Sequence, residues 1–103
     1  MNVYNPLIMK ILFRMHAIER MFERGIAVPD VRAALENGET IEHYADPDYP
    51  SRLVLIRRGK RSLHVVAAEN TTSAETVIVT CYQPHRSRWT ENFKQRRDEM
   101  PDV

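Results

Sequence analysis

Two stretches of the chain, residues 61–68 and 76–82, alternate with a period of two and are rich in β-branched and aromatic side chains. The residues between them, 69–75, include Asn, Thr, Ser and Ala. This order predicts an antiparallel hairpin. The rest of the chain has to fold around that hairpin.

The two faces of the predicted hairpin differ in chemistry. If Ala68 pairs with Thr76, His64 lies opposite Thr80, and Tyr82 follows two residues later on the same face. A register shift of one residue would undo this pairing. The other face is then a core face, made of Leu63, Val65, Ala67, Val77, Val79 and Cys81.

Length and composition predict a single domain over residues 1–103 that forms its own core. The one cysteine excludes an internal disulfide and a cysteine-rich zinc site. The longest apolar run, residues 7–13, is too short to span a bilayer, and no signal peptide pattern precedes it. We therefore expect a cytoplasmic protein without membrane contact.

The four histidines show no recognisable metal-ligand spacing, so no metal site or cofactor is expected.

Charge is unevenly distributed along the chain. Acidic residues dominate residues 30–48, whereas residues 52–61 and 86–97 are basic. This pattern predicts one positive side of the molecule, which is either a polyanion site or solvated surface. The basic residues of the first segment are Arg52, Arg57, Arg58, Lys60 and Arg61.

The N-terminal part predicts helices. Either one helix runs over residues 6–24 from an Asn5-Pro6 cap, or residues 11–14 are extended and a helix begins near Met15. In both cases Gly25 ends the helix. Its predicted buried stripe is Ile18, Met21 and Phe22.

A second helix is predicted to open at Pro29 and Asp30 and to end at residues 37–38, with Val31, Ala34 and Leu35 facing inward. Residues 39–44 and 52–58 are predicted strands that precede the hairpin.

After the hairpin, Ser87 or Thr90 is expected to cap a closing helix through Arg97, with Trp89 and Phe93 packing on the body. The predicted class is α+β: two N-terminal helices, a four-stranded antiparallel sheet and a C-terminal helix.

Several segments resemble a bacterial domain-of-unknown-function family, number 4258. They are residues 16–26, 37–44, 48–50, 63–66 and 80–84, followed by Trp89 and Phe93. The resemblance runs from His16 to Arg97. The sequence departs from the family at Cys81, where a valine-like residue is usual, and at residues 14–15, which replace a polar cap.

The resemblance implies a RelE-like or barnase-like microbial ribonuclease fold. Members of that superfamily are often toxins of bacterial type II toxin–antitoxin pairs that cut RNA. The resemblance therefore implies a metal-independent endoribonuclease, with free or ribosome-bound mRNA and a cognate zinc-finger or helix-turn-helix antitoxin as partners. Likeness of fold alone does not establish activity.

RNA cleavage without a metal needs a base, an acid and a cation. Imidazoles suit both proton transfers, and guanidinium groups suit phosphate. The expected catalytic residues are His16, His64, Arg20, Thr80 and Tyr82. The expected substrate-binding residues are Arg24, Arg57, Arg58, Lys60 and Arg61.

A simpler interpretation stays open for each of these groups. His64, between a leucine and a valine, fits a core histidine with both nitrogens hydrogen-bonded. Arg20 and Arg24 could form surface ion pairs with Glu19 or Glu23. Cys81, on the predicted core face, is not expected to be a nucleophile. The competing hypothesis is accordingly a non-catalytic module that binds protein or RNA.

Overall fold

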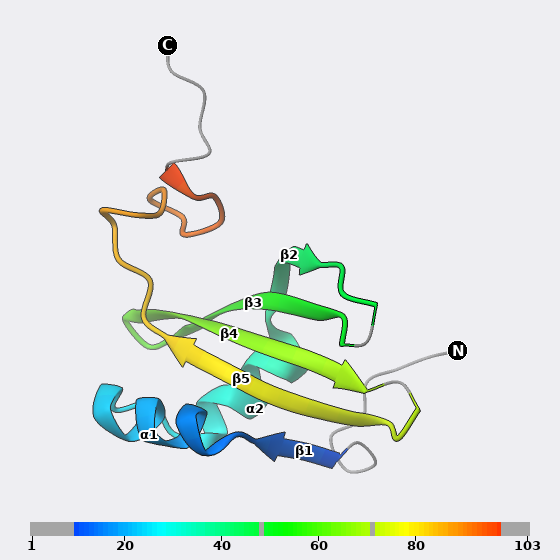
Figure 1. Ribbon diagram of the computed structural model, residues 1–103. Helices are drawn as coiled ribbons and strands as arrows, with labels where there is room; N and C mark the ends of the chain where they lie inside the picture. Colours follow the sequence, from blue (N-terminus) through cyan, green and yellow to red (C-terminus); the bar gives the residue numbers. More distant parts are fainter. Residues whose placement is uncertain (1–9, 48, 71, 98–103) are drawn as a thin grey trace.

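The computed structural model describes residues 10–47, 49–70 and 72–97 and shows two helices packed on one side of a five-stranded sheet (Figure 1). The predicted α+β class is confirmed. The elements are β1 (Lys10–Phe13), α1 (Met15–Arg24), α2 (Val28–Asn37), β2 (Glu39–Tyr44), β3 (Ser51–Arg58), β4 (Arg61–Asn70) and β5 (Glu75–Tyr82).

The prediction of four antiparallel strands was wrong by one strand. The sheet order is β1-β5-β4-β3-β2, and β1 pairs with β5 in parallel. Ile11 and Phe13 of β1 pack against the core beside Thr76 and Ile78. Residues 11–13 are thus extended and the helix begins at Met15, the second of the two alternatives. The predicted Asn5-Pro6 cap lies outside the described residues.

The central hairpin forms, but the predicted pairing of Ala68 with Thr76 was wrong, because Ala68 pairs with Val77. His64 pairs with Tyr82 and Val66 with Thr80, whereas Ala67 already pairs with Ile78. A β-bulge therefore places an additional residue, Val79, in β5.

The bulge changes which residues of β5 face the helices. Ile78 and Cys81 join the core together with Leu63, Val65 and Ala67, while Val77 and Val79 stay half-buried outside it. The predicted core positions Val77 and Val79 were wrong because a strict period of two cannot pass through a bulge. His64, Val66, Thr80 and Tyr82 still share one face, which we call the outer face of the sheet.

The helices cover the inner face through few side chains. Val31, Ala34 and Leu35 of α2 are buried, as predicted. On α1 the buried residues are Ala17 and Met21, whereas Ile18 and Phe22 are exposed. The prediction of a buried stripe through Ile18 and Phe22 was wrong, since α1 is turned so that Ala17 approaches the sheet. No helix among the described residues is long and apolar enough to cross a membrane.

The junction between the helices is held by local hydrogen bonds. Gly25 has φ 64°, and the N–H of Ile26 donates to the carbonyl of Met21 at 2.9 Å, which ends α1 as predicted. At the start of α2, a carboxylate oxygen of Asp30 accepts from the N–H of Ala27 at 2.9 Å. Arg61 of β4 donates to the carbonyl of Gly25 at 3.0 Å and so joins the helix end to the sheet.

The chain after β5 forms no α-helix among residues 83–97, so the predicted closing helix was wrong. Trp89 and Arg96 form an antiparallel bridge instead, with hydrogen bonds from Thr90 N to Gln95 O and from Arg97 N to Arg88 O. Asn92 closes the turn by accepting from Lys94 N at 3.1 Å, and Phe93 has φ 61°. These hydrogen bonds are incompatible with a helix.

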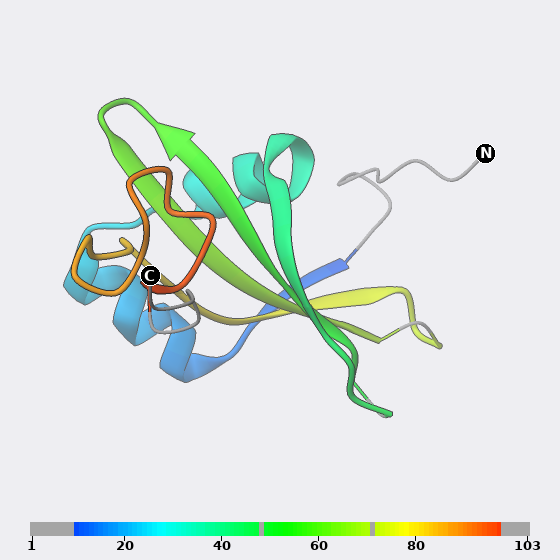
Figure 2. The same cartoon turned by 90° about the horizontal axis from the view of Figure 1, so that it is seen from above.

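This closing segment, residues 83–97, lies on the side of the sheet opposite α1 and α2 (Figure 1). Seen from above, its loops lie at the same end of the sheet as the β3–β4 turn (Figure 2). Trp89, predicted to pack on the body, is 3% exposed and does so without a helix.

Candidate functional site

His64 lies on the outer face of β4 under the closing segment and is 0% exposed. Its ring meets Trp89 edge to face, with centroids 4.3 Å apart, and Tyr82 in the same manner at 5.3 Å. Nε2 lies 2.8 Å from the carbonyl oxygen of Phe93, and Nδ1 lies 3.3 Å from the hydroxyl of Tyr82. Both ring nitrogens therefore have partners.

These contacts determine the form of the imidazole. A carbonyl oxygen only accepts, so Nε2 carries the proton and Nδ1 accepts from the Tyr82 hydroxyl. Burial lowers the pKa of His64 below its ordinary value of 6.5; the hydrogen bond to Phe93 opposes this change, and the charge of Arg96 adds to it. His64 is thus neutral at pH 7.

Tyr82 is the half-buried end of this arrangement. Burial raises the pKa of its phenol above the ordinary value of 10, so it stays protonated and donates to His64. Thr80 follows on the same face, opposite Val66. Arg24 reaches the same strand from α1, because its Nη1 donates to the carbonyl of Cys81 at 2.7 Å. The structure therefore places three predicted site residues, His64, Tyr82 and Thr80, on one face of the sheet, and Arg24 contacts the backbone of β5 next to Tyr82.

Arg96 anchors the closing segment over this region. Its guanidinium carbon lies 4.6 Å from the centre of the Trp89 ring, and the group contacts a carboxylate oxygen of Glu42 at 3.3 Å and the hydroxyl of Tyr44 at 3.2 Å. Burial alone would lower the pKa of Arg96, but the hydrogen bonds to Tyr44 and Glu42 outweigh it and raise that pKa. The segment is held by a charged residue that cannot deprotonate.

A cavity of about 200 Å³ lies between the β3–β4 turn and the closing segment, and His64 is not one of its lining residues. Arg57, Lys60 and Arg86 line it, against one carboxylate, Glu91. We call it the cationic cavity. Two further lining residues connect it to the histidine: Ser62, two residues before His64 on β4, and Phe93, whose carbonyl His64 contacts.

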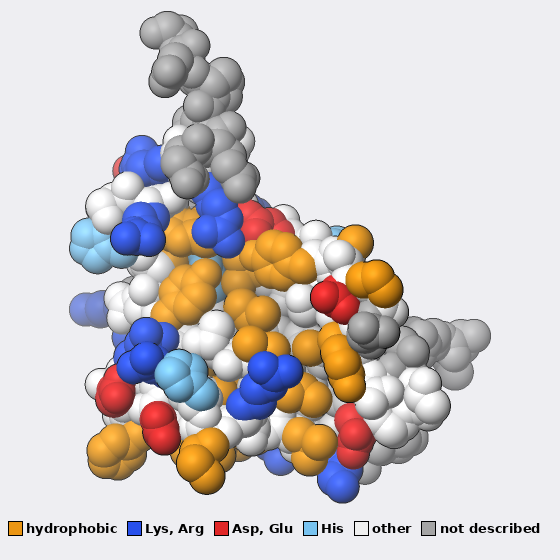
Figure 3. Space-filling model, in the orientation of Figure 1, with side chains coloured by type: hydrophobic (Ala, Val, Ile, Leu, Met, Phe, Trp, Pro, Cys, Tyr) orange, Lys and Arg blue, Asp and Glu red, His pale blue; other side chains and the backbone are white. Residues whose placement is uncertain are grey.

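A second hollow of about 410 Å³ shares Arg57 and Ser62 with the cationic cavity. Asn37, Leu55 and Asn92 also line it, so it offers amide groups beside apolar surface. In the space-filling view, apolar side chains form a band across the middle of the molecule, and Lys, Arg and His side chains border it on the left (Figure 3).

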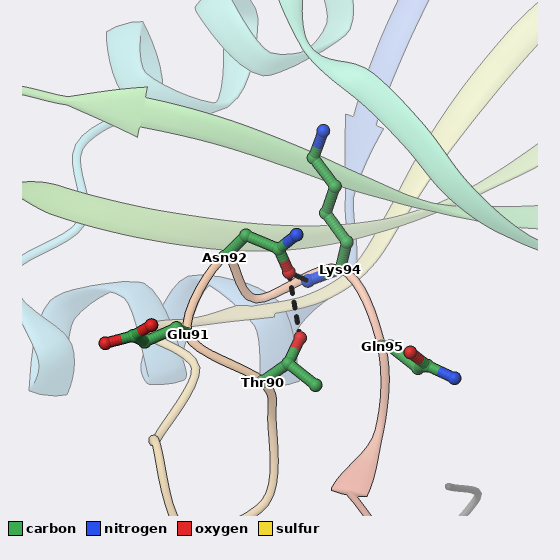
Figure 4. Close-up of a pocket in the computed structure, with 5 residues that line it drawn as sticks. All are labelled: Thr90, Glu91, Asn92, Lys94 and Gln95. Carbon is green, nitrogen blue, oxygen red and sulfur yellow. Dashed lines mark hydrogen bonds between the residues drawn. The ribbon is translucent and has the colours of Figure 1, made fainter.

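A third hollow, of about 350 Å³, is lined only by residues 90–95 of the closing segment (Figure 4). The amide oxygen of Asn92 is occupied there, because it accepts from the Thr90 hydroxyl at 2.8 Å (Figure 4). The side chains of Lys94 and Gln95 point away from each other. This hollow brings no chemically complementary groups together.

The remaining predicted site residues lie elsewhere. His16 is exposed on α1, and no hydrogen bond among the described residues joins it to His64. Arg20 pairs with Glu23 at 3.1 Å. Arg58 and Arg61 contact the carboxylate of Asp30 at 3.0 and 3.9 Å on the helix side of the sheet. The basic segment 52–61 is thus divided between the two faces.

Sequence reasoning missed Ser62 and Arg86 as lining residues of the cavity. Arg86 could have been found, since it opens the second basic segment, residues 86–97. Ser62 carried no signal beyond its place two residues before His64. Over residues 10–47, 49–70 and 72–97, no three His, Cys, Asp or Glu side chains gather as metal ligands would.

The fold and site define an α+β protein with a mixed five-stranded sheet, a cationic cavity and a buried histidine. A family model described as a domain of unknown function, DUF4258, matches residues 13–83. The chain belongs to this family, and the family predicted from the sequence is confirmed over residues 13–83, a match that ends before Trp89 and Phe93. His64, Tyr82, Arg57 and Lys60 lie inside the matched part, whereas Arg86 lies beyond it. No curated protein and no solved structure matches the chain significantly.

Proposed function

We propose that the protein binds RNA and holds a backbone phosphate in the cationic cavity. The observation that carries this proposal is the convergence of Arg57, Lys60 and Arg86 on one cavity from two separate parts of the chain. A guanidinium offers paired donors that match phosphate oxygens, and an ammonium adds a compact charge.

The adjoining hollow supports a nucleotide rather than a free phosphate ion as the ligand. It shares Arg57 and Ser62 with the cavity and adds the amides of Asn37 and Asn92 beside Leu55. Proteins recognise single-stranded RNA through unstacked bases that meet hydrogen-bonding groups and apolar surface. A phosphate in the cavity would leave the next base within this hollow.

Fluorescence anisotropy with a short labelled single-stranded RNA tests the proposal. We expect Arg57→Ser and Arg86→Ser each to weaken binding and to reduce the salt slope of log K by about 0.7, the value for one lost phosphate contact on a single strand. Arg32→Ser is the matched control, because it removes the same charge from the exposed surface of α2. Equal weakening by all three variants would refute the cavity as the site.

The second candidate is the endoribonuclease toxin that the family resemblance implies, held inactive by a cognate antitoxin. The hydrogen bond from the Tyr82 hydroxyl to Nδ1 of His64 favours it. Tyr82 would pass its proton to His64 while taking the proton of a ribose 2′-hydroxyl. The 2′-oxygen would attack phosphorus and break the bond to the 5′-oxygen, leaving a 2′,3′-cyclic phosphate.

This mechanism also needs an acid for the departing 5′-oxygen and a cation for the phosphate. His16 and Arg20, the residues predicted for these roles, lie on α1 away from His64, so substrate binding would have to bring RNA to both. The low pKa of buried His64 makes it a weak base, which is why we rank binding above cleavage.

Detection of cyclic-phosphate ends on free or ribosome-bound mRNA would establish cleavage. Tyr82→Phe should abolish it while leaving RNA binding unchanged. RNA binding without cyclic-phosphate products would favour the non-catalytic RNA-binding function and exclude cleavage.

A further inference from the structure

Helix α1 carries an apolar stripe on the side that does not face the sheet. Met15, Ile18 and Phe22 are 77%, 53% and 90% exposed. Their spacing of three and four residues aligns them on one helix face. Single exposed apolar side chains are ordinary, but an aligned set on one helix is a feature of contact surfaces.

Folding does not require this stripe, because α1 reaches the core through Ala17 and Met21 on its other side. A phenylalanine that is 90% exposed contributes almost no burial to the stability of the isolated chain. The stripe is available to a partner.

The borders of the stripe indicate the chemistry of that partner. Glu19 and Glu23 stand one helical turn apart and follow Met15 along one border, while the other border turns into the core at Met21. Figure 3 shows apolar and acidic side chains next to one another at the lower left, where α1 lies. Glu23 is paired with Arg20 at 3.1 Å, and its side chain stays 56% exposed.

We propose that this stripe binds an amphipathic helix of a partner protein, whose apolar face is flanked by Lys or Arg residues. Helix-on-helix packing matches a straight row of three apolar side chains, and the basic flank matches Glu19 and Glu23. This inference is independent of the proposed RNA site.

The charge pattern disfavours a second copy of the chain as the occupant. In an antiparallel pair of α1 helices related by a two-fold axis, like borders meet. Glu19 and Glu23 of both copies would then lie together, and juxtaposed like charges oppose association.

Two synthetic helical peptides test the proposal. They share a leucine face, and one is flanked by Lys and the other by Glu. We expect the protein to bind the Lys-flanked peptide about tenfold more tightly or better. Phe22→Gln, which keeps helix propensity, should weaken that binding about tenfold or more. Tyr49→Gln is the matched control, because Tyr49 is 53% exposed outside α1 and its loss should change nothing.

A charge-reversed variant makes the test independent of any effect on folding. Glu19→Lys combined with Glu23→Lys should reverse the preference toward the Glu-flanked peptide. Three outcomes would overturn the proposal: equal affinity for both peptides, a dimer in light scattering that Phe22→Gln dissociates, or Phe22-dependent binding to phosphatidylcholine vesicles in place of the peptides.

Discussion

Nε2 of His64 lies 2.8 Å from the carbonyl oxygen of Phe93, which ties the middle of β4 to the segment that covers it. Because that oxygen can only accept, the bond requires a proton on Nε2 and leaves Nδ1 to the hydroxyl of Tyr82. The histidine therefore links the sheet, β5 and the closing segment through one neutral ring.

The first prediction concerns pH. Burial holds the pKa of His64 below 6.5 in the folded protein. Below about pH 6.5 the imidazole of His64 takes up a proton in the unfolded chain but not in the folded one. The free energy of unfolding therefore falls as the pH falls, by at most about 1.4 kcal/mol per pH unit. Urea unfolding at about pH 7.5 and about pH 5.5 measures this.

The matching variant is His64→Gln, which should lose this part of the pH dependence. Asp30 does not interfere in this window. Burial opposes the ionisation of Asp30, but hydrogen bonds from Ala27 and Arg58 lower its pKa below 3.8. The stability that Asp30 contributes is therefore lost only at more acid pH. Identical slopes in the parent and the variant would contradict the role given to His64.

The second prediction uses the single tryptophan of the chain. Arg96→Met should loosen the closing segment, because it removes the contacts with Trp89, Glu42 and Tyr44, at a cost of about 1–2 kcal/mol. Trp89 emission should shift to the red, and trypsin should cleave residues 83–97 faster. Lys94→Met likewise removes one trypsin site, but it loses only the exposed pair with Glu39, at 3.0 Å, so we expect neither a red shift nor faster cleavage. A red shift of equal size in both variants would argue against Arg96 as the anchor.

The third prediction compares two glycines. A Cβ at Gly38 would lie 2.4 Å from both the Ala34 carbonyl oxygen and a methyl of Val54, so Gly38→Ala should cost about 1–3 kcal/mol through overpacking. A Cβ at Gly59 would meet nothing within 4 Å, but its φ of 62° should cost Gly59→Ala about 1 kcal/mol. Denaturant unfolding measures the loss of stability in each variant, and we expect the larger loss for Gly38→Ala. A larger loss for Gly59→Ala would show that α2 can move away from β3 at little cost.

The fourth prediction separates a structural arginine from a surface arginine. Arg61→Met removes the hydrogen bond to the Gly25 carbonyl and should cost about 1 kcal/mol. Arg20→Met removes only an exposed pair with Glu23 and should cost about 0–0.5 kcal/mol. Thermal unfolding of both variants checks the difference. Equal costs would mean that Arg61 does not stabilise the junction between α1 and β4.

Much of the fold could be predicted because its signals are local. Gly25 ends α1, and Val31, Ala34 and Leu35 face the core, as helical spacing indicates. The closing helix was predicted wrongly because the spacing of Trp89 and Phe93 also suits a loop closed by Asn92. Local pattern does not reveal the Trp89–Arg96 bridge, since it depends on a turn that brings the two residues together.

The candidate site was predictable only in part, for a geometric reason. Ala68 pairs with Val77 rather than with Thr76, and the bulge adds a second residue of shift, so the partner of His64 is Tyr82 rather than Thr80. Successive side chains of a strand point to opposite faces, so Arg57 and Arg58 lie on opposite faces of β3 although they are neighbours in the sequence. Burial of His64 depends on the closing segment, which strand periodicity cannot place.

Cys81 is 0% exposed beneath α1, and burial raises the pKa of its thiol to about 11. A thiol-alkylating reagent can therefore modify Cys81 only when β5 separates from the helices. Since this is the only thiol of the chain, the rate of labelling under native conditions reports one opening event, with no competing sites to subtract. The labelling rate of Cys81 therefore measures how often the sheet separates from the helices.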